Sequence, residues 1–203
     1  MDEHDGPPGV APVPREPAAE PQVPAYPAGL AGDVDTAKGA RLHVRPIRTT
    51  DGPGLAEFHR GLSDRSVYRR FFFVHPALTD VEVEHFTHVD YADRLALVAE
   101  DDGRIVAVGR YERTPGTAEA EVAFVVTDSH QQLGIGSVLL AQLARAALGR
   151  GITTFTAETL AENRAMLAVF RNSGYALTTS TEFDTVSVRF PIDALSGPAP
   201  PPG

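Results

Sequence analysis

The chain of 203 residues contains no cysteine. This absence excludes disulfides, thiolate metal ligands and a cysteine nucleophile, and with them any covalent acyl-enzyme formed through sulfur. No run of about eighteen apolar residues occurs, and the acidic start MDEHDGPPGV lacks the apolar core of a secretory signal. These absences predict a cytoplasmic protein.

Basic residues are also scarce, which excludes one class of partner. The formal net charge is -9, and Lys38 is the only lysine in the chain. Residues 1–39 hold seven acidic residues against Arg15 and Lys38, so more than half of the net negative charge lies there. No basic patch indicates nucleic-acid binding. A coding bias toward arginine explains the single lysine more simply than protection from self-modification does.

Proline is concentrated at the N-terminal end of the chain. Eight of the 17 prolines lie in residues 1–39, among alanines, glycines and acids without apolar periodicity. A segment of this composition cannot bury enough apolar surface to fold, so we expect a disordered Pro/Ala-rich tail over residues 1–39. SGPAPPPG predicts a second disordered tail over residues 196–203, which leaves one folded domain at residues 40–195.

The pattern within this domain mixes strands and helices. RLHVRPIR predicts a first strand. Three helices are predicted to follow, beginning at Asp51, at Ser63 or Asp64, and at Thr79 or Asp80. Alternation and the turn sequences DDG and TPGTA predict an antiparallel meander of strands in RLALVAE, RIVAVGRYER and AEAEVAFVVT. The later predicted elements are a helix after Gly134, a strand in ITTFTAE, a helix over residues 162–172 and strands near YALTT and TVSVRF. This mixed order predicts an α/β (α+β) fold.

A glycine-rich turn, SHQQLGIGSVLL, connects the third strand of the meander to an amphipathic helix. The unpaired amides of a helix N-terminus can bind a phosphate, and Gly134 and Gly136 allow the backbone to approach one closely. The turn is not a dinucleotide-binding fingerprint, which needs glycine in place of Leu139, and it lacks the Lys-Ser/Thr pair of a P-loop. Taken alone, the two glycines are explained equally well by a purely structural role in shaping the turn.

Two motifs at a fixed separation carry a family resemblance. Gln131, Gly134 and Gly136 match the pattern Q/R-x-x-G-x-G/A, which resembles motif A of the GNAT superfamily of acetyl-CoA-dependent N-acetyltransferases. AENRAMLAVFRNSGY resembles the next helix of that superfamily, in which Asn163 is followed eleven residues later by Gly174 and then Tyr175. The resemblance covers roughly residues 41–193. It implies a mixed, mostly antiparallel central sheet flanked by helices, with acetyl-CoA as cosubstrate and no metal.

A narrower resemblance concerns the acceptor. VRPIRTTDGPGLAEFHRGLSDRSVYRRFF and LTDVEVEHFTHVDYADRLALVAE, with the two motifs, are similar to bacterial Pat-type protein lysine acetyltransferases, whose relatives modify acyl-CoA synthetases. The implied reaction is acetyl transfer to the ε-amine of a protein lysine. Members often carry a synthetase-like or cyclic-nucleotide-binding domain, for which residues 1–39 are too few and too rich in proline. Acetylation of a small amine, and a non-catalytic acetyl-CoA sensor or scaffold, remain alternatives.

The reaction requires a neutral amine. An unperturbed lysine has a pKa of about 10.4, so a general base contributes directly to the rate at neutral pH. The resemblance implies that Glu121 in AEVAFVV is this base. Glu119 lies two residues earlier, hence on the same strand face, and is the competing candidate.

The resemblance also implies the cofactor contacts. Backbone groups of Phe124, Val125 and Val126 pair with the pantetheine arm, and one amide there faces the thioester oxygen. Amides from Gln132 or Leu133 through Ser137 hold the pyrophosphate. The complete set of expected cofactor-binding residues is Phe124, Val125, Val126, Gln131, Gln132, Leu133, Gly134, Ile135, Gly136, Ser137, Asn163 and Phe170.

Three residues of the second motif need separate interpretation. Asn163 either hydrogen-bonds the pantetheine arm or caps the helix that it begins. Phe170 replaces the tyrosine that many GNAT enzymes use as general acid, so protonation of the leaving thiolate would depend on solvent. Tyr175 is offset by five residues from that position and is expected in the core.

The histidine-rich segment EHFTHVDY contains potential metal ligands. His85 and His88 share a helix face, but no third histidine and no HExxH arrangement accompanies them and Asp90. We expect no metal. The segment either lines the substrate entrance or simply ends a helix in a polar turn.

Overall fold

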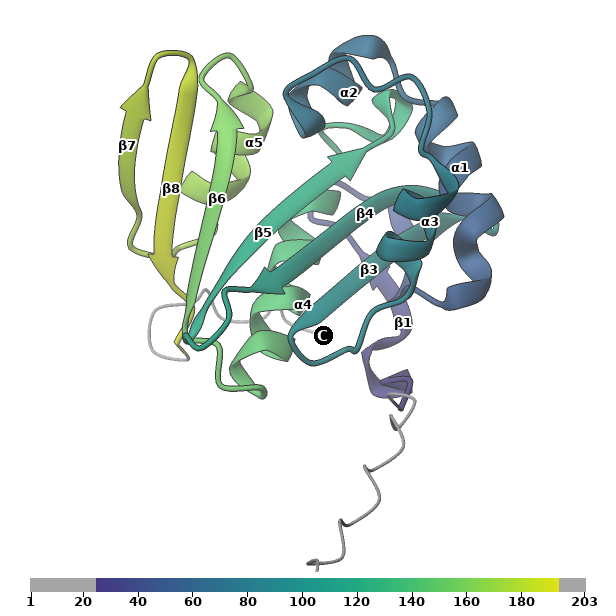
Figure 1. Cartoon of the computed structure of the whole chain (residues 1–203), viewed down its shortest axis with the longest axis horizontal. Coiled ribbons are helices and arrows are strands. Elements are labelled where there is room, and N and C mark those ends of the chain that lie inside the picture. The colour runs from purple at the N-terminus through teal and green to yellow at the C-terminus, as the bar shows by residue number, and fades with distance from the viewer. Residues whose placement is uncertain (1–24, 194–203) are drawn as a thin grey trace, which may run out of the picture.

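The computed structural model describes residues 25–193 and contains one eight-stranded sheet with the strand order β1-β2-β3-β4-β5-β6-β8-β7 (Figure 1). The strands are β1 (Gly32–Asp35), β2 (Arg41–Pro46), β3 (Arg94–Asp101), β4 (Arg104–Arg113), β5 (Glu119–Val126), β6 (Thr154–Leu160), β7 (Thr178–Glu182) and β8 (Thr185–Pro191). All neighbours are antiparallel except β5 and β6. The predicted α/β fold with a mostly antiparallel sheet and the predicted meander are therefore confirmed.

The helices cover both faces of the sheet. They are α1 (Gly52–Arg60), α2 (Asp64–Phe71), α3 (Asp80–Thr87), α4 (Ile135–Leu148) and α5 (Arg164–Arg171), with 3-10 turns at Ala28–Leu30, Thr49–Asp51 and Asp128–His130. Helices α1–α3 pack on one face around Phe58 and Val98, whereas α4 and α5 pack on the other around Leu97 and Leu139. Side chains alternate along a strand, so each face of the sheet buries its own core.

The alternation of β5 decides which of its residues face which helices. Ala120, Val122 and Phe124 are buried in the core with α4 and α5. The residues between them, including Glu121 and Val125, therefore face the side of α1–α3.

The expected boundary of the N-terminal tail at residue 39 is wrong. Residues 32–35 form β1, which pairs with β2, and Val34 packs against the main core. Seven of the eight N-terminal prolines precede residue 25, so the composition that indicated disorder ends before β1 begins. Residues 1–24 and 196–203 lie outside the described residues, where the two tails remain predictions.

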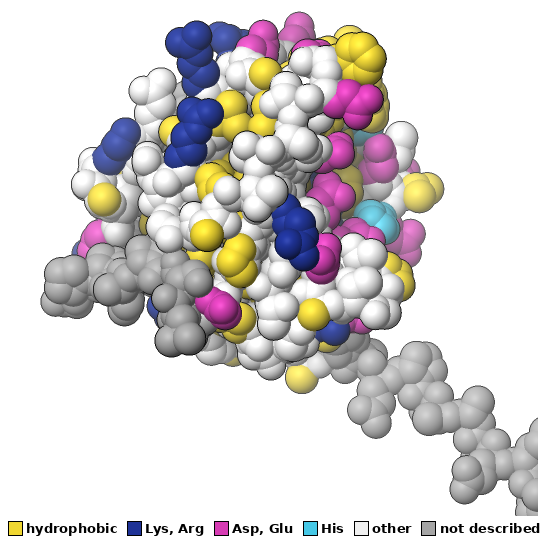
Figure 2. Space-filling view, turned by 90° about the vertical axis from the view of Figure 1, so that its left-hand side faces the viewer, with side chains coloured by type: hydrophobic (Ala, Val, Ile, Leu, Met, Phe, Trp, Pro, Cys, Tyr) yellow, Lys and Arg dark blue, Asp and Glu magenta, His cyan; other side chains and the backbone are white. Residues whose placement is uncertain are grey.

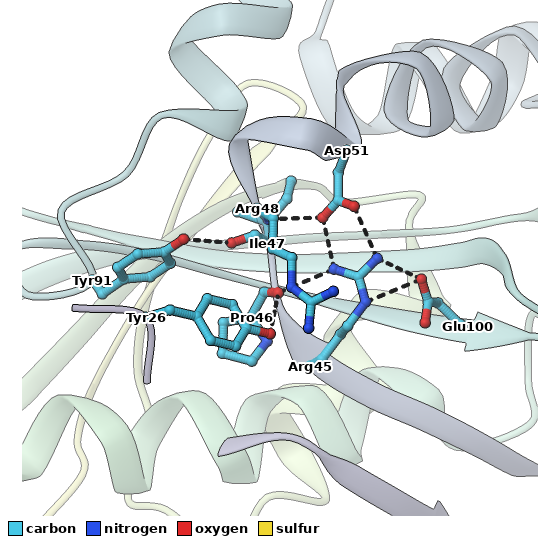
Figure 3. Close-up of polar contacts among 8 residues, drawn as sticks. All are labelled: Tyr26, Arg45, Pro46, Ile47, Arg48, Asp51, Tyr91 and Glu100. Atoms are coloured by element: carbon cyan, nitrogen blue, oxygen red, sulfur yellow. Dashed lines mark hydrogen bonds and ion pairs between the residues drawn. The ribbon is translucent and has the colours of Figure 1, made fainter. Parts of the chain in front are cut away.

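Asp51 does not have the predicted role of side-chain cap for α1. Its carboxylate instead accepts hydrogen bonds from Arg45 at 2.7 and 2.9 Å and from the Arg48 amide at 2.7 Å (Figure 3). Glu100 completes the arrangement by pairing with the other edge of the same guanidinium. These bonds, with that from Asp51 foremost, raise the pKa of buried Arg45 above its usual value.

Other helix starts agree with the sequence. Ser63 caps α2 by accepting the amide of Ser66, and Thr79 forms a reciprocal capping box with Glu82 at α3.

Near the C-terminal end, one strand differs in position from the prediction. β7 begins three residues later than YALTT suggested, because Tyr175 instead stacks on Phe190, with ring centroids 5.4 Å apart.

Replacing Asp51 with Asn should lower the free energy of unfolding by about 1–3 kcal/mol, because a buried guanidinium then loses its bidentate anionic partner. Urea unfolding of the purified chain measures the change. Asp35→Asn, at an exposed carboxylate of β1, is the matched control and should stay within about 0.5 kcal/mol. Equal losses in the two variants would contradict a specific role for the Arg45 pair.

Candidate active site

The site begins where β5 and β6 separate. Their parallel pairing extends only from Glu119 opposite Thr154 to Glu121 opposite Thr156. Beyond this point the two strands diverge, as Figure 1 shows, and a cleft opens between them that is lined by residues 121–126 of β5. On this side the β5 backbone has no neighbouring strand among the described residues, so its amides and carbonyls are available to an extended ligand.

The glycine turn forms another wall of the cleft. Gly134 is the N-cap of α4 with φ 85°, and Gln132 has φ 65°, both in the left-handed region. Residues 134–137, where α4 begins, line the cleft, and the first amides of a helix lack partners within it. A Cβ on Gly136 would lie 3.1 Å from the Val169 side chain, so glycine there permits α5 to approach closely.

The structure brings together all but one of the expected cofactor residues. Those that line the cleft are Phe124, Val125, Val126, Gln131, Gln132, Gly134, Ile135, Gly136, Ser137, Asn163 and Phe170. Leu133 does not, because its side chain packs against the main core.

Two cleft residues on α5 also have structural roles. The Asn163 side-chain oxygen accepts the amide of Met166 at 3.3 Å, so Asn163 caps α5 and borders the cleft at the same time. Phe170 is 1% exposed, and its ring contacts those of Phe124 and Phe190. The aromatic ring at position 170 therefore forms part of the core that closes the cleft.

The side chain of the motif residue Gln131 forms hydrogen bonds within the protein. Gln131 donates hydrogen bonds to the Ser66 hydroxyl at 2.9 Å and to the Val126 carbonyl at 3.3 Å. Asp128 accepts from the Ser63 amide and from the hydroxyls of Ser63 and Ser66. Burial alone would raise the pKa of Asp128, but these hydrogen bonds outweigh it and lower the pKa below its usual value. Together they bind α2 to the loop before α4.

The two candidate bases differ in their surroundings. Glu119 forms an ion pair with Arg189 and lies outside the cleft. Glu121 is exposed and lines the cleft, and among residues 25–193 its side chain forms neither a hydrogen bond nor an ion pair. Its carboxylate is therefore the one left available for a proton.

A second groove meets the cleft at Glu121. It follows the exposed face of β6, β8 and β7, and most of the residues that line it have polar side chains: Thr156, Glu158, Thr178, Ser180, Ser187 and Arg189. Glu121 and Glu158 belong to both hollows. Figure 2, which looks onto the side of β7 and β8, shows acidic side chains mainly on the right and basic ones mainly at the upper left.

Sequence reasoning missed several residues of the cleft. Lys38, in the turn between β1 and β2, lines it near Gln132 and Gly134, and the neighbouring Thr36 lies 3.5 Å from where a Cβ of Gly134 would be. These residues were missed because residues 1–39 were expected to form a disordered tail. Arg69 and Arg70 also reach the cleft from α2, and only their place in the narrower resemblance could have drawn attention to them.

The histidine-rich segment has local partners. A ring nitrogen of His88 contacts the Glu84 carbonyl, and the Asp90 carboxylate accepts the amides of Ala92 and Arg94. No cluster of three potential ligands for a metal ion occurs among the described residues.

The family follows from comparison with known proteins. The model of the Acetyltransferase (GNAT) family matches residues 65–175. The chain belongs to this family. It is thus an acetyltransferase by family. Within residues 25–193, no helix combines the length and apolar character needed to cross a membrane.

The individual relatives include Pat acetyltransferases. Acetyltransferase Pat of Mycolicibacterium smegmatis is 35% identical over 150 residues, which are 70% of this chain but 43% of that protein. The chain thus matches less than half the length of this curated relative. The GNAT domain of S. lividans PAT is 40% identical with a TM-score of 0.77, covering 82% of this chain and 99% of that one. A cAMP-binding acyltransferase from Mycobacterium smegmatis is 27% identical with a TM-score of 0.59, covering 86% and 52%.

Gly134→Ala should lower the free energy of unfolding by about 1–2 kcal/mol, because an L-residue is strained at φ 85°. Denaturant unfolding measures the loss. Gly149→Ala, at the other end of α4 with φ −62°, is the control and should not be destabilised. If both substitutions had the same effect, backbone strain at Gly134 would not explain it.

Proposed function

We propose that the chain transfers the acetyl group of acetyl-CoA to the ε-amine of protein lysines, with acyl-CoA synthetases as the first targets to test. The observation that carries the proposal is the position of Glu121, where the cleft and the polar groove meet. The donor would occupy the cleft and the acceptor the groove, so the reacting groups would meet at this carboxylate.

The cleft suits coenzyme A in both shape and polarity. The free edge of β5 would pair with the pantetheine arm, and the first amides of α4 would bind the pyrophosphate. A solved GNAT-fold protein from Salmonella typhimurium is described with acetyl-CoA as its cofactor, although at 18% identity it supports only the likeness of fold.

The chemistry requires no covalent enzyme intermediate. The acceptor amine would give up a proton to Glu121, directly or through one water, and its nitrogen would form a bond to the thioester carbonyl carbon. An amide of β5 would stabilise the oxyanion. The carbon–sulfur bond then breaks, and the leaving thiolate, with an ordinary pKa of about 8.5, takes a proton from solvent.

The likeness to Pat proteins and the open groove favour a protein acceptor. The exposed face of β6, β8 and β7 has no helix over it in Figure 1, so a lysine on a folded surface could reach Glu121. A small amine is the competing acceptor, and an acetyl-transfer assay with each kind of acceptor distinguishes the two. Residence in the cytoplasm and the absence of a metal remain predictions.

Glu121→Gln should lower kcat for lysine acetylation by about 10²–10⁴-fold, because the amide cannot accept the proton. Mass spectrometry of a purified acyl-CoA synthetase measures the transfer, and calorimetry should show unchanged acetyl-CoA affinity. Glu119→Gln, which only disrupts the ion pair with Arg189, is the comparison. A larger loss in Glu119→Gln than in Glu121→Gln would reverse the assignment.

Lys38→Ala should weaken acetyl-CoA binding about two- to fivefold, because we place the exposed ammonium beside the coenzyme phosphates. The difference should shrink as ionic strength rises. Arg41→Ala, at an exposed cation of the same hairpin, is the control. Unchanged affinity in Lys38→Ala at low salt would exclude the contact.

A further inference from the structure

Two arginines beside the proposed base have no anionic partner in contact. Arg70 lies in the last turn of α2, and Arg110 lies on β4. Within residues 25–193 neither guanidinium forms a hydrogen bond or an ion pair. Arg110 instead lies over the ring of Phe86, 4.3 Å from its centroid, and Arg70 lies 5.1 Å from that of Phe71. Aromatic faces hold the two cations in place without neutralising them.

Their position connects them to the site. Arg70 lines the cleft together with Glu121, and the Glu121 charge acts on its guanidinium. Arg110 is directly opposite Ala123 in the β4–β5 register, on the face that Glu121 shares. Both arginines also border a small, mainly apolar cavity under α1–α3, which adjoins the cleft. Arg70 therefore lies in the wall of the cleft that Glu121 also lines, and Arg110 lies in the adjoining cavity.

The two charges are held at a free-energy cost. Burial lowers the pKa of Arg70. Burial, and next the proximity of Arg70, lowers the pKa of Arg110 to about 9. The Glu112 carboxylate contacts a third cation, Arg94, at 3.9 Å. Glu121 attracts Arg70 and Glu112 attracts Arg110, but neither carboxylate contacts its arginine. Like charges withdrawn from water without an anion in contact are destabilising, and an anion placed between them would relieve the cost.

We infer that Arg70 and Arg110 form a binding site for a carboxylate of one of the substrates. The guanidinium fork fits a carboxylate with two parallel hydrogen bonds, and such charge-assisted bonds are among the strongest in proteins. The inference rests on the proposed function. The carboxylate has two conceivable sources: an acidic group next to the reacting amine of the acceptor, or the far end of a dicarboxylic acyl chain on coenzyme A.

Binding can be tested without turnover. The Nε–Hε signals of Arg70 and Arg110 in the full chain, labelled with ¹⁵N and assigned through Arg70→Gln and Arg110→Gln, are followed by NMR during titration with glutarate. Glutaramide, its uncharged diamide, is the control ligand. We expect saturable shifts of both signals with glutarate alone. The absence of saturable shifts, or equal shifts with glutaramide, would overturn the inference.

The source of the carboxylate is identified by measuring turnover with matched pairs of substrates. One pair is two lysine peptides that differ by Glu or Gln beside the lysine, and the other is succinyl-CoA and acetyl-CoA with one acceptor. Arg70→Gln and Arg110→Gln should lower kcat/KM for the carboxylate-bearing member of one pair about 10- to 100-fold, and for its neutral counterpart less than about threefold. Arg65→Gln on α2 and Arg104→Gln on β4 are exposed controls.

The outcomes separate the inference from the proposed function. Saturable glutarate binding without acetyl transfer to any lysine would refute the proposed function and leave the carboxylate site standing. Lysine acetylation that falls equally for charged and neutral substrates in both variants would refute the carboxylate site and leave the function standing. In that case the two cations only balance Glu121 and Glu112.

Discussion

The early end of the β5–β6 pairing is the constraint on which the rest of the site depends. β5 remains paired with β4 as far as Val126, and β6 remains paired with β8 as far as Leu160, so each strand is held on its outer side. Their inner sides can therefore separate after Glu121 without loss of the sheet. The separation creates the cleft, leaves one edge of β5 free, and ends next to the carboxylate that we propose as the base.

A hydrogen-bonded network makes α2 part of the cleft. Asp128 and Gln131 bind Ser63 and Ser66, so the start of α2 is attached to the loop that precedes α4. Arg70, on the same helix, is thereby held in the wall of the cleft. These hydrogen bonds therefore connect the wall that we assign to the coenzyme phosphates with the helix that carries Arg70.

Local features of the sequence predicted much of this structure. Asp102 and Gly103 both adopt positive φ, as a two-residue hairpin turn requires, and the glycine of the motif A turn does so at Gly134. Such conformations depend on a few adjacent residues, so a single sequence can reveal them. The family resemblance likewise singles out Glu121 on the strand before the turn, and the structure shows that this residue lines the cleft.

The missed features depend on contacts between distant segments. The sequence of β1 resembles a tail because its few apolar residues become significant only beside β2. Asp51 resembles a helix cap in sequence, but Arg45 and Glu100, which decide its role, come together only in the folded sheet. The partners of Gln131, and the lack of partners for Arg70 and Arg110, follow from tertiary packing in the same way.

The meeting of the cleft and the groove has a kinetic consequence. The two hollows share only Glu121 and Glu158, so a large acceptor docked on the uncovered strands would not block the passage of coenzyme A. Under the proposed assignment a ternary complex can form from either binary complex, and coenzyme A can leave while the modified protein is still docked. Relative affinities, rather than steric obstruction, would then set the order in which substrates enter and products leave.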